Sequence, residues 1–445
     1  MKKIIFSFLA FVLLFNSSLL SEDDDDLVDE KTANDPLRIE ARSGSLKAQF
    51  QLANEYFYGQ NRPRNYNIAA LWYKKAAEQG SPAAAFNLAI CYERGTGVEK
   101  SEYNAYLWYK KAAEAGVKLA KYNLALSLAY GIPPDEKQKT PPVFADPDEA
   151  EKLLDGLKAE GFLPAFRELA ALILEKENAG TDDHEKVFKL LSYAADRDDV
   201  PSMRMLSECY YLGRGCPRDL EKMIFWIKKA ATRKDAEAIG KLAFCYKYGE
   251  GITASPEKAF KLYKVAAAMG LPMAKVKLAE YYENGEFVPY DLAEARRLYE
   301  EAANDKNPYA LFKMGIFAYD GIGQEPDKLK AVGYFFQAAK LGESHAQYNI
   351  ATFFEEGKLM EPDPSAAFYW YRQAAAQNDA VAQRKTAYCY FDGRGVEKDY
   401  EKGYQWLKRA AANGDREAVY AVREITTPPP EDSLPPLGDE LPAID

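Results

Sequence analysis

Two stretches of the sequence are nearly identical: AALWYKKAAEQG at residues 69–80 and AYLWYKKAAEAG at residues 105–116. They lie 36 residues apart, and further steps of 36 residues find the same skeleton from about residue 45 to about residue 425. Self-similarity at such a period is typical of proteins that stack small helical units instead of folding around one globular core. The 445-residue chain is therefore predicted to be a long array of repeats.

The first half of each repeat predicts an amphipathic helix. Counted from an opening small residue, most copies have a large apolar residue at +4, a small residue at +5 and an aromatic residue at +8, a spacing that forms one helical stripe. The small +5 residue lets a neighbouring helix approach closely. A glycine at +11 in most copies stands where a helix C-cap needs a positive φ. The opening residues of the ten copies are Ala48, Ala84, Ala120, Ala165, Ser202, Ala238, Ala274, Ala310, Ala346 and Ala382.

The second half of each repeat predicts another helix. In several copies it carries a pair such as Trp72-Tyr73, then an alanine pair, and it ends at a glycine or a polar residue. A lone helix between Asp35 and Gly44 and another ending near Ile425 are expected to cap the array, because end units must shield the stacked core from water. The alanine pairs begin at Ala76, Ala112, Ala194, Ala230, Ala266, Ala302, Ala338, Ala374 and Ala410.

This skeleton resembles the Sel-one-like repeat (SLR), a relative of the tetratricopeptide repeat. The resemblance covers roughly residues 45–425 and rests on the opening alanine, the Leu-small pair, the aromatic, Gly-x-Gly, Ala-x-x-Trp-Tyr and Ala-Ala in that order. It implies an all-α fold: a right-handed α-solenoid of antiparallel helix pairs with a concave inner face, made of about ten 36-residue repeats plus capping helices. It also implies an adaptor or scaffold role in assembling other proteins.

The N-terminus does not share the repeat. Two lysines and the apolar run from Ile4 to Phe15 predict a cleaved export signal peptide over residues 1–21, and residues 22–34 read as an acidic disordered segment. The mature chain is then expected to be periplasmic or secreted, with no membrane span. The alternative is a chain anchored in the membrane by an uncleaved N-terminal segment.

Two other features interrupt the array, which is expected to span residues 35–425. The third repeat gains a Pro-rich insertion loop at residues 132–145, and the fourth, from Ala165, lacks the loop glycines. Insertions in solenoids fall on loops. Such changes therefore reflect neutral drift, a contact with a partner, or a local change in superhelix pitch near residues 130–185. The final residues, 426–445, read as a Pro-rich disordered tail.

Charge and composition narrow the partners. A net charge of −10 repels a phosphate backbone, so no nucleic-acid partner is expected. The chain has two histidines, His184 and His345, and neither has a second histidine within helical reach. We therefore expect no metal site. The absence of a Gly-rich phosphate loop or a paired Cys-x-x-Cys predicts no bound cofactor.

The five cysteines are expected to be free thiols. Cys91, Cys209, Cys245 and Cys389 all occupy position +7 of a first helix, near the buried stripe, where cysteine acts as a small apolar residue. Equivalent sites in stacked helices lie about 10 Å apart, beyond disulfide reach. Cys216 falls in a loop. One branch of the resembled family carries a disulfide in every repeat, and this chain lacks that pattern.

Catalysis is not expected. Some members of the resembled family have been described as β-lactamases or penicillin-binding proteins, and Ser255-x-x-Lys258 matches the Ser-x-x-Lys nucleophile motif. No Ser-Asp-Asn or Lys-Thr-Gly accompanies it, and Ser255 stands where a helix N-cap is needed. A cell-wall-active or β-lactamase-like hydrolase remains the enzymatic alternative to a scaffold.

A candidate protein-binding face lies on the first helices. Positions +2, +6 and +9 point away from the buried stripe and carry aromatic and arginine side chains, the usual anchors of protein interfaces. A protein or peptide partner of unknown identity is expected to lie along them. Two alternatives stay open: the +2 rings pack against the next repeat, or the face binds peptidoglycan or another carbohydrate. The candidates are Phe50, Phe86, Tyr122, Arg167, Arg204, Phe244, Phe312, Tyr348, Arg384 and Tyr388.

Overall fold

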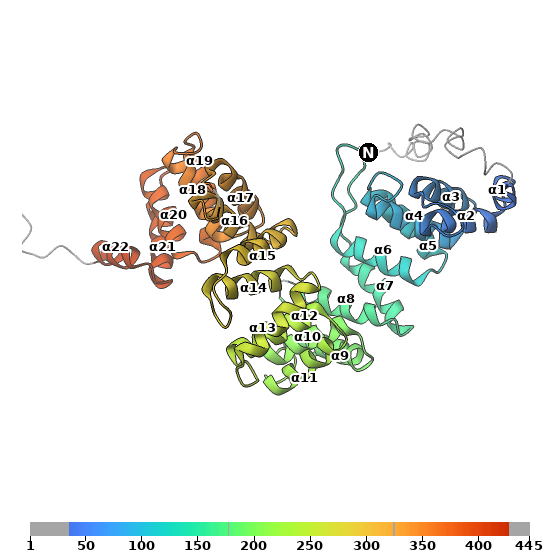
Figure 1. The fold of residues 1–445 in the computed structure, drawn as a ribbon, viewed down its shortest axis with the longest axis horizontal. Helices are drawn as coiled ribbons and strands as arrows, with labels where there is room; N and C mark the ends of the chain where they lie inside the picture. The colour runs from blue at the N-terminus through green and yellow to red at the C-terminus, as the bar shows by residue number, and fades with distance from the viewer. Residues whose placement is uncertain (1–34, 177, 324, 427–445) are drawn as a thin grey trace, which may run out of the picture. The chain divides into compact units, whose positions relative to one another are not determined.

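The computed structural model describes residues 35–176, 178–323 and 325–426, which form 22 α-helices. The predicted signal peptide (1–21), the acidic segment (22–34) and the tail from residue 427 onward lie outside the described residues. The chain divides into two compact bodies. The N-terminal body contains residues 35–209 and 213–217, and the C-terminal body contains residues 210–212 and 218–426. In each body consecutive helices pack against one another as antiparallel pairs (Figure 1).

The predicted first helices all form, and nearly all are 13 residues long. Most end at the +11 glycine, which adopts a left-handed conformation, as Gly95 does with a φ of 67°. The first helices are α2 (Leu46–Tyr58), α4 (Pro82–Arg94), α6 (Lys118–Tyr130), α8 (Leu163–Leu174), α10 (Val200–Leu212), α12 (Ala236–Tyr248), α14 (Pro272–Asn284), α16 (Pro308–Asp320), α18 (Ser344–Glu356) and α20 (Ala380–Asp392).

The second helices form as well, and a side-chain cap fixes the start of most of them. Asp399, for example, accepts a hydrogen bond from the backbone N–H of Lys402 at 2.9 Å. The second helices are α3 (Tyr66–Glu78), α5 (Glu102–Glu114), α7 (Pro147–Ala159), α9 (Thr181–Asp196), α11 (Leu220–Thr232), α13 (Pro256–Ala268), α15 (Leu292–Asn304), α17 (Lys328–Lys340), α19 (Pro364–Ala376) and α21 (Tyr400–Ala412). The two predicted capping helices are α1 (Pro36–Arg42) and α22 (Arg416–Thr426).

The repeated small residues form the contact between helices. The opening alanine of each copy and the first alanine of each pair are buried, because only a methyl group fits where two helix backbones approach closely. Large side chains fill the space between these contacts, and Trp72 and Tyr371 are among the largest that are fully buried. The prediction of an all-α repeat solenoid of about ten helix pairs is confirmed.

The two irregular repeats keep the helix pair and change only the loops. In the third repeat the inserted residues leave α6 at Gly131 and pair with themselves: Ile132 and Val143 exchange both backbone hydrogen bonds at 2.8 Å. In the fourth repeat α8 ends at Glu175 in a right-handed conformation, because no glycine is present to adopt the left-handed one.

Candidate protein-binding face

The ten candidate residues all lie on first helices, and we refer to them together as the first-helix face. Nine of them are half-buried, and only Phe244 is exposed, at 45%. The division into two bodies separates the set. Phe50, Phe86, Tyr122, Arg167 and Arg204 belong to the N-terminal body, and Phe244, Phe312, Tyr348, Arg384 and Tyr388 to the C-terminal body.

The aromatic rings at position +2 pack on the second helix of their own repeat. Ring centroids are 5.9 Å apart for Phe50 and Tyr73, and 5.6 Å apart for Tyr348 and Tyr371. The same contact joins Phe86 to Tyr109 and Phe312 to Phe335, both at 5.8 Å. These contacts leave each of the four rings half-buried.

The +2 side chains also reach the start of the next repeat's first helix. Phe312 stacks on His345 with centroids 5.5 Å apart, and Arg167 and Arg384 form ion pairs at the equivalent place. The Arg384 guanidinium lies 2.9 Å from Asp415, the residue at the start of α22. These contacts hold consecutive repeats together, as the packing alternative predicted. The +2 side chains nevertheless remain partly exposed, as binding of a partner along the first-helix face requires.

Tyr122 and Arg167 are brought together in the N-terminal body. Arg167 donates a hydrogen bond to the Tyr122 hydroxyl at 3.1 Å, and that hydroxyl donates to Glu168 at 2.8 Å. Arg167 also lies 3.6 Å from Asp199. Burial raises the pKa of Tyr122 to about 12, with a further contribution from the Glu168 carboxylate. The phenol is therefore neutral at physiological pH and acts as a hydrogen-bond donor.

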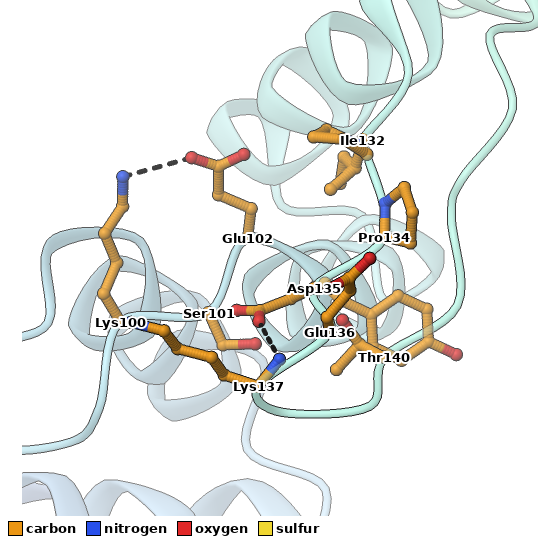
Figure 2. Close-up of a pocket in the computed structure, with 11 residues that line it drawn as sticks. Lys100, Ser101, Glu102, Ile132, Pro134, Asp135, Glu136, Lys137 and Thr140 are labelled. Carbon is orange, nitrogen blue, oxygen red and sulfur yellow. Dashed lines mark hydrogen bonds and ion pairs between the residues drawn. The ribbon is translucent and has the colours of Figure 1, made fainter.

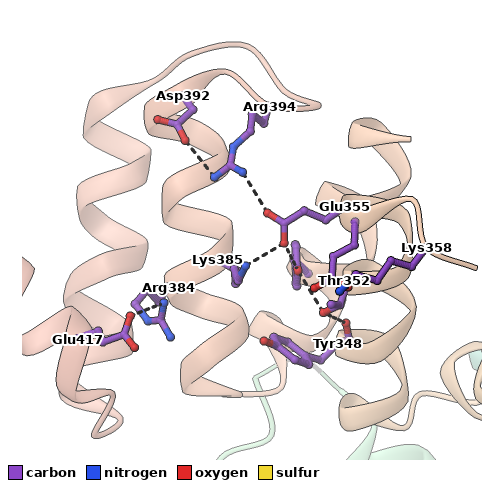
Figure 3. Close-up of polar contacts among 11 residues, drawn as sticks. Tyr348, Thr352, Glu355, Lys358, Arg384, Lys385, Asp392, Arg394 and Glu417 are labelled. Carbon is purple, nitrogen blue, oxygen red and sulfur yellow. Dashed lines mark hydrogen bonds and ion pairs between the residues drawn. The ribbon is translucent and has the colours of Figure 1, made fainter. Parts of the chain in front are cut away.

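A polar network beside the face was not predicted from the sequence. In Figure 3 it centres on Glu355 of α18: the buried Tyr371 hydroxyl donates to it at 2.6 Å, and Lys385 and Arg394 lie 2.8 Å and 3.0 Å away. Burial raises the pKa of Glu355, but the hydrogen bonds from Lys385 and Tyr371 outweigh it, so the pKa is lowered overall. The carboxylate is therefore ionised and fully occupied with protein partners.

The same network recurs two repeats earlier, so its spacing can be recognised in the sequence. Tyr299 donates to Glu283 at 2.7 Å, and Lys313 pairs with the same carboxylate at 2.7 Å. In both cases a tyrosine at +25 is matched by a glutamate at +9 and a lysine at +3 of the following repeat. The sequence pattern identifies the periodic tyrosines, and the structure adds the partners of their hydroxyl groups.

The exposed Phe244 contacts a second aromatic residue that was not predicted from the sequence. Tyr248, one turn further along α12, is 55% exposed, and the two ring centroids are 4.6 Å apart. Lys247 lies beside them, 5.8 Å from the Tyr248 ring centroid, and pairs with Glu286 at 3.4 Å. Phe244 and Tyr248 form an exposed aromatic pair on a first helix, which we call the α12 aromatic pair.

The insertion contributes a shallow pocket of about 430 Å³ against the start of α5. Figure 2 shows Lys100, Glu102, Asp135 and Lys137 around it, so its lining carries charges of both signs and selects no single ligand class. The insertion is tied down by Gln138, whose side-chain amide donates to the Lys100 carbonyl at 2.8 Å.

The isolated candidates for chemistry have structural roles. Ser255 caps α13, its hydroxyl accepting the backbone N–H of Lys258 at 3.4 Å. His345 stacks on Phe312 and lies 3.0 Å from Glu343. Within the described residues no three His, Cys, Asp or Glu side chains are grouped so as to hold a metal ion. Over the same part of the chain, no helix is both long and apolar enough to span a membrane.

The cysteines lie as predicted. None of the five is in a disulfide; the four at position +7 are buried, and Cys216 is half-buried.

Comparison with known proteins identifies the repeat. The family model described as Sel1 repeat matches nine segments, and the fourth repeat, which lacks the loop glycines, is the unmatched one. No curated protein matches the chain. The matched segments are residues 46–81, 82–117, 118–139, 200–235, 236–271, 272–307, 308–343, 344–379 and 380–415.

Solved structures with the same repeat are similar to this chain over most of its length. One is c5321, a protective antigen of uropathogenic Escherichia coli strains displaying an SLR fold, at 26% identity and a TM-score of 0.49, with 87% of this chain and 81% of that chain covered. Another is a Sel1 repeat protein from Oxalobacter formigenes, at 24% identity and a TM-score of 0.46, covering 87% of this chain and 89% of that one.

Proposed function

Because this chain belongs to the Sel1 repeat family, we propose that it is an exported scaffold that binds a protein or peptide partner along its first-helix face. Sel1 repeats commonly serve as protein-interaction scaffolds. A repeat array presents equivalent positions at regular intervals, which suits an extended partner better than a compact ligand. Export rests on the predicted signal peptide at residues 1–21, and the sequence of the mature N-terminus in cell-envelope fractions tests it.

The α12 aromatic pair is the observation that carries this proposal. Phe244 and Tyr248 are exposed, contact each other and lie on a first helix. Exposed aromatic side chains that are already ordered lose little conformational entropy on binding, so they are effective anchors. The other aromatic residues of the face, such as Phe50 and Tyr348, are half-buried by packing. Binding should therefore depend most strongly on the α12 aromatic pair.

The test needs a control phenylalanine with similar exposure in a different position. Phe225 is 57% exposed, lies on the second helix α11, and also contacts an aromatic ring, that of Trp226, with centroids 5.2 Å apart. Photo-cross-linking residues placed at 244 and at 225 in the native cell envelope should capture a partner from position 244 only. The captured protein is then titrated against the purified wild-type chain, Phe244→Ser and Phe225→Ser.

We expect Phe244→Ser to weaken binding at least tenfold, which corresponds to about 1.4 kcal/mol, and Phe225→Ser to leave binding unchanged. Both variants should keep the wild-type melting temperature, because neither ring is buried. Equal binding by Phe244→Ser and the wild type, at unchanged stability, would remove the first-helix face as the binding site. Capture of glycan strands instead of protein would favour the carbohydrate-binding alternative.

A further inference from the structure

One repeat carries two cysteines, and their positions are related by the fold. Cys209 occupies position +7 of α10, and Cys216 occupies position +14, in the loop that follows. The other three repeats with a cysteine at +7 have an aliphatic residue at +14: Val98, Ile252 or Val396. In this repeat Cys216 therefore replaces the aliphatic residue that the other three repeats have at +14.

The loop containing Cys216 folds back on the end of α10. The backbone N–H of Arg214 donates to the Cys209 carbonyl at 3.0 Å, and the N–H of Asp219 donates to the Tyr210 carbonyl at 2.9 Å. Both ends of the segment are thus fixed to the last turn of the helix. Between them Gly215, with a φ of 68°, lies so close to the His184 carbonyl that a Cβ at this position would overlap it.

Equivalent repeats indicate where the +14 side chain points. Ile252 packs against the core cluster that contains Cys245, and Val396 packs against the cluster that contains Cys389. In each case the +14 side chain packs against the same cluster as the +7 side chain of its repeat. Cys216 occupies position +14 of its own repeat and is half-buried, and Cys209 at +7 is buried.

The two thiols also affect each other electrostatically. The pKa of Cys209 is raised to about 11, mainly by burial and in part by Cys216. Cys216 follows two glycines with positive φ, Gly213 and Gly215, in the loop after α10, and a disulfide requires the two Cβ atoms to come within about 4.5 Å of each other.

We propose that Cys209 and Cys216 form a reversible disulfide within their repeat when they meet a small-molecule disulfide oxidant. This inference goes beyond partner binding and does not depend on it. The half-buried Cys216 reacts first: its thiolate attacks one sulfur of a disulfide such as oxidised glutathione and releases one glutathione thiolate. The Cys209 thiolate then attacks the Cys216 sulfur of the mixed disulfide and expels the second glutathione.

The reaction balances without any other reagent. The two protein thiols lose two protons and two electrons, the S–S bond of the oxidant is cleaved, and two glutathione molecules are formed. The repeats of Cys91, Cys245 and Cys389 cannot react in this way, because no second thiol lies at their +14 positions. The disulfide is therefore specific to one loop and would fix that loop to the end of α10.

The experiment counts thiols and maps the bond in the full chain. Purified protein is incubated with oxidised glutathione, alkylated under denaturing conditions and digested with trypsin. Cleavage after Arg204, Arg214 and Arg218 places Cys209 and Cys216 on separate peptides, 205–214 and 215–218. Oxidation should join these two peptides and reduce the free thiols from the five of the reduced chain to three.

Two variants make the result decisive. Cys216→Val restores the residue found at +14 in two other repeats, so it should fold normally and keep four free thiols before and after oxidation. Ile252→Cys copies the arrangement beside Cys245 and should gain a second disulfide, which tests the geometry independently. The proposal is overturned if Cys209 and Cys216 remain fully alkylated after oxidation, if Cys216 stops at the mixed disulfide with glutathione, or if it joins another cysteine.

Discussion

Replacing Glu355 by glutamine removes the charge at the centre of the polar network and leaves the shape of the side chain. Tyr371 and Lys385 each lose a hydrogen bond to a carboxylate, at 2.6 Å and 2.8 Å, and the new amide group places a donor against other donors. Hydrogen bonds to charged groups contribute roughly 1.5–3 kcal/mol when buried, whereas the 47%-exposed Arg394 adds little. Glu355→Gln should therefore destabilise the C-terminal body by about 2–3 kcal/mol.

The pH dependence of this loss has a definite sign. The pKa of Glu355 is lower in the folded state than its ordinary value of 4.5. Its stabilising contribution is therefore complete above pH 4.5 and is lost as the pH falls through the lowered folded-state pKa. The stability gap between the wild type and Glu355→Gln should be constant near neutral pH and shrink progressively below pH 4.5.

Urea denaturation followed by the fluorescence of Trp370 and Trp406, which lie on α19 and α21 near the network, measures the gap at each pH. Arg394→Gln is the matched control. It removes the exposed guanidinium and its ion pairs with Glu355 and Asp392, and it should cost less than about 0.5 kcal/mol. Wild-type stability of Glu355→Gln at pH 7, or a stability gap that persists undiminished at pH 3, would contradict this role of Glu355.

Three further predictions address the loops and the caps. Gly395→Ala should destabilise the C-terminal body by roughly 2 kcal/mol more than Gly393→Ala in urea denaturation, because both glycines have a positive φ but only a Cβ at 395 overlaps the Pro364 carbonyl. Ser255→Ala should cost about 1 kcal/mol as a lost helix cap, and neither it nor the wild type should hydrolyse a chromogenic β-lactam. Phe144→Ser, at an 82%-exposed position of the insertion, should leave the melting temperature unchanged.

The fold was predictable because the same packing problem recurs every 36 residues. A residue such as Ala374 has an equivalent environment in each copy, so its identity repeats, and the helix pairs can be aligned without knowing any contact. The left-handed glycines follow from the same logic, since Gly95 and Gly393 end equivalent helices. The insertion has no such equivalent. Ile132 pairs with Val143, and no repeated pattern in the sequence links these two residues.

The first-helix face was harder to predict for a geometric reason. A helical wheel for one helix correctly directs position +2 away from the buried stripe, but it does not include the neighbouring helices. In the stacked array Phe312 contacts Phe335 of its own repeat and His345 of the next. The Phe312 side chain therefore points away from the buried stripe of its own helix but contacts two neighbouring helices. Its exposure depends on these contacts, which a single helix does not reveal.

The α12 aromatic pair is not buried between neighbouring helices in this way. In its repeat position +2 is Gly240, and Leu271 from the start of α14 lies so close that a Cβ on Gly240 would be 2.8 Å from the Leu271 Cδ2 atom. Leu271 thus fills the space that a +2 ring occupies in other repeats, and Phe244 at +6 is left exposed to water. Exposed apolar area costs free energy that burial would recover, at about 25 cal/mol per Å². Packing within the chain partly buries the other rings of the first-helix face and leaves Phe244 exposed. A partner that covers Phe244 would therefore bury the most apolar area of this face.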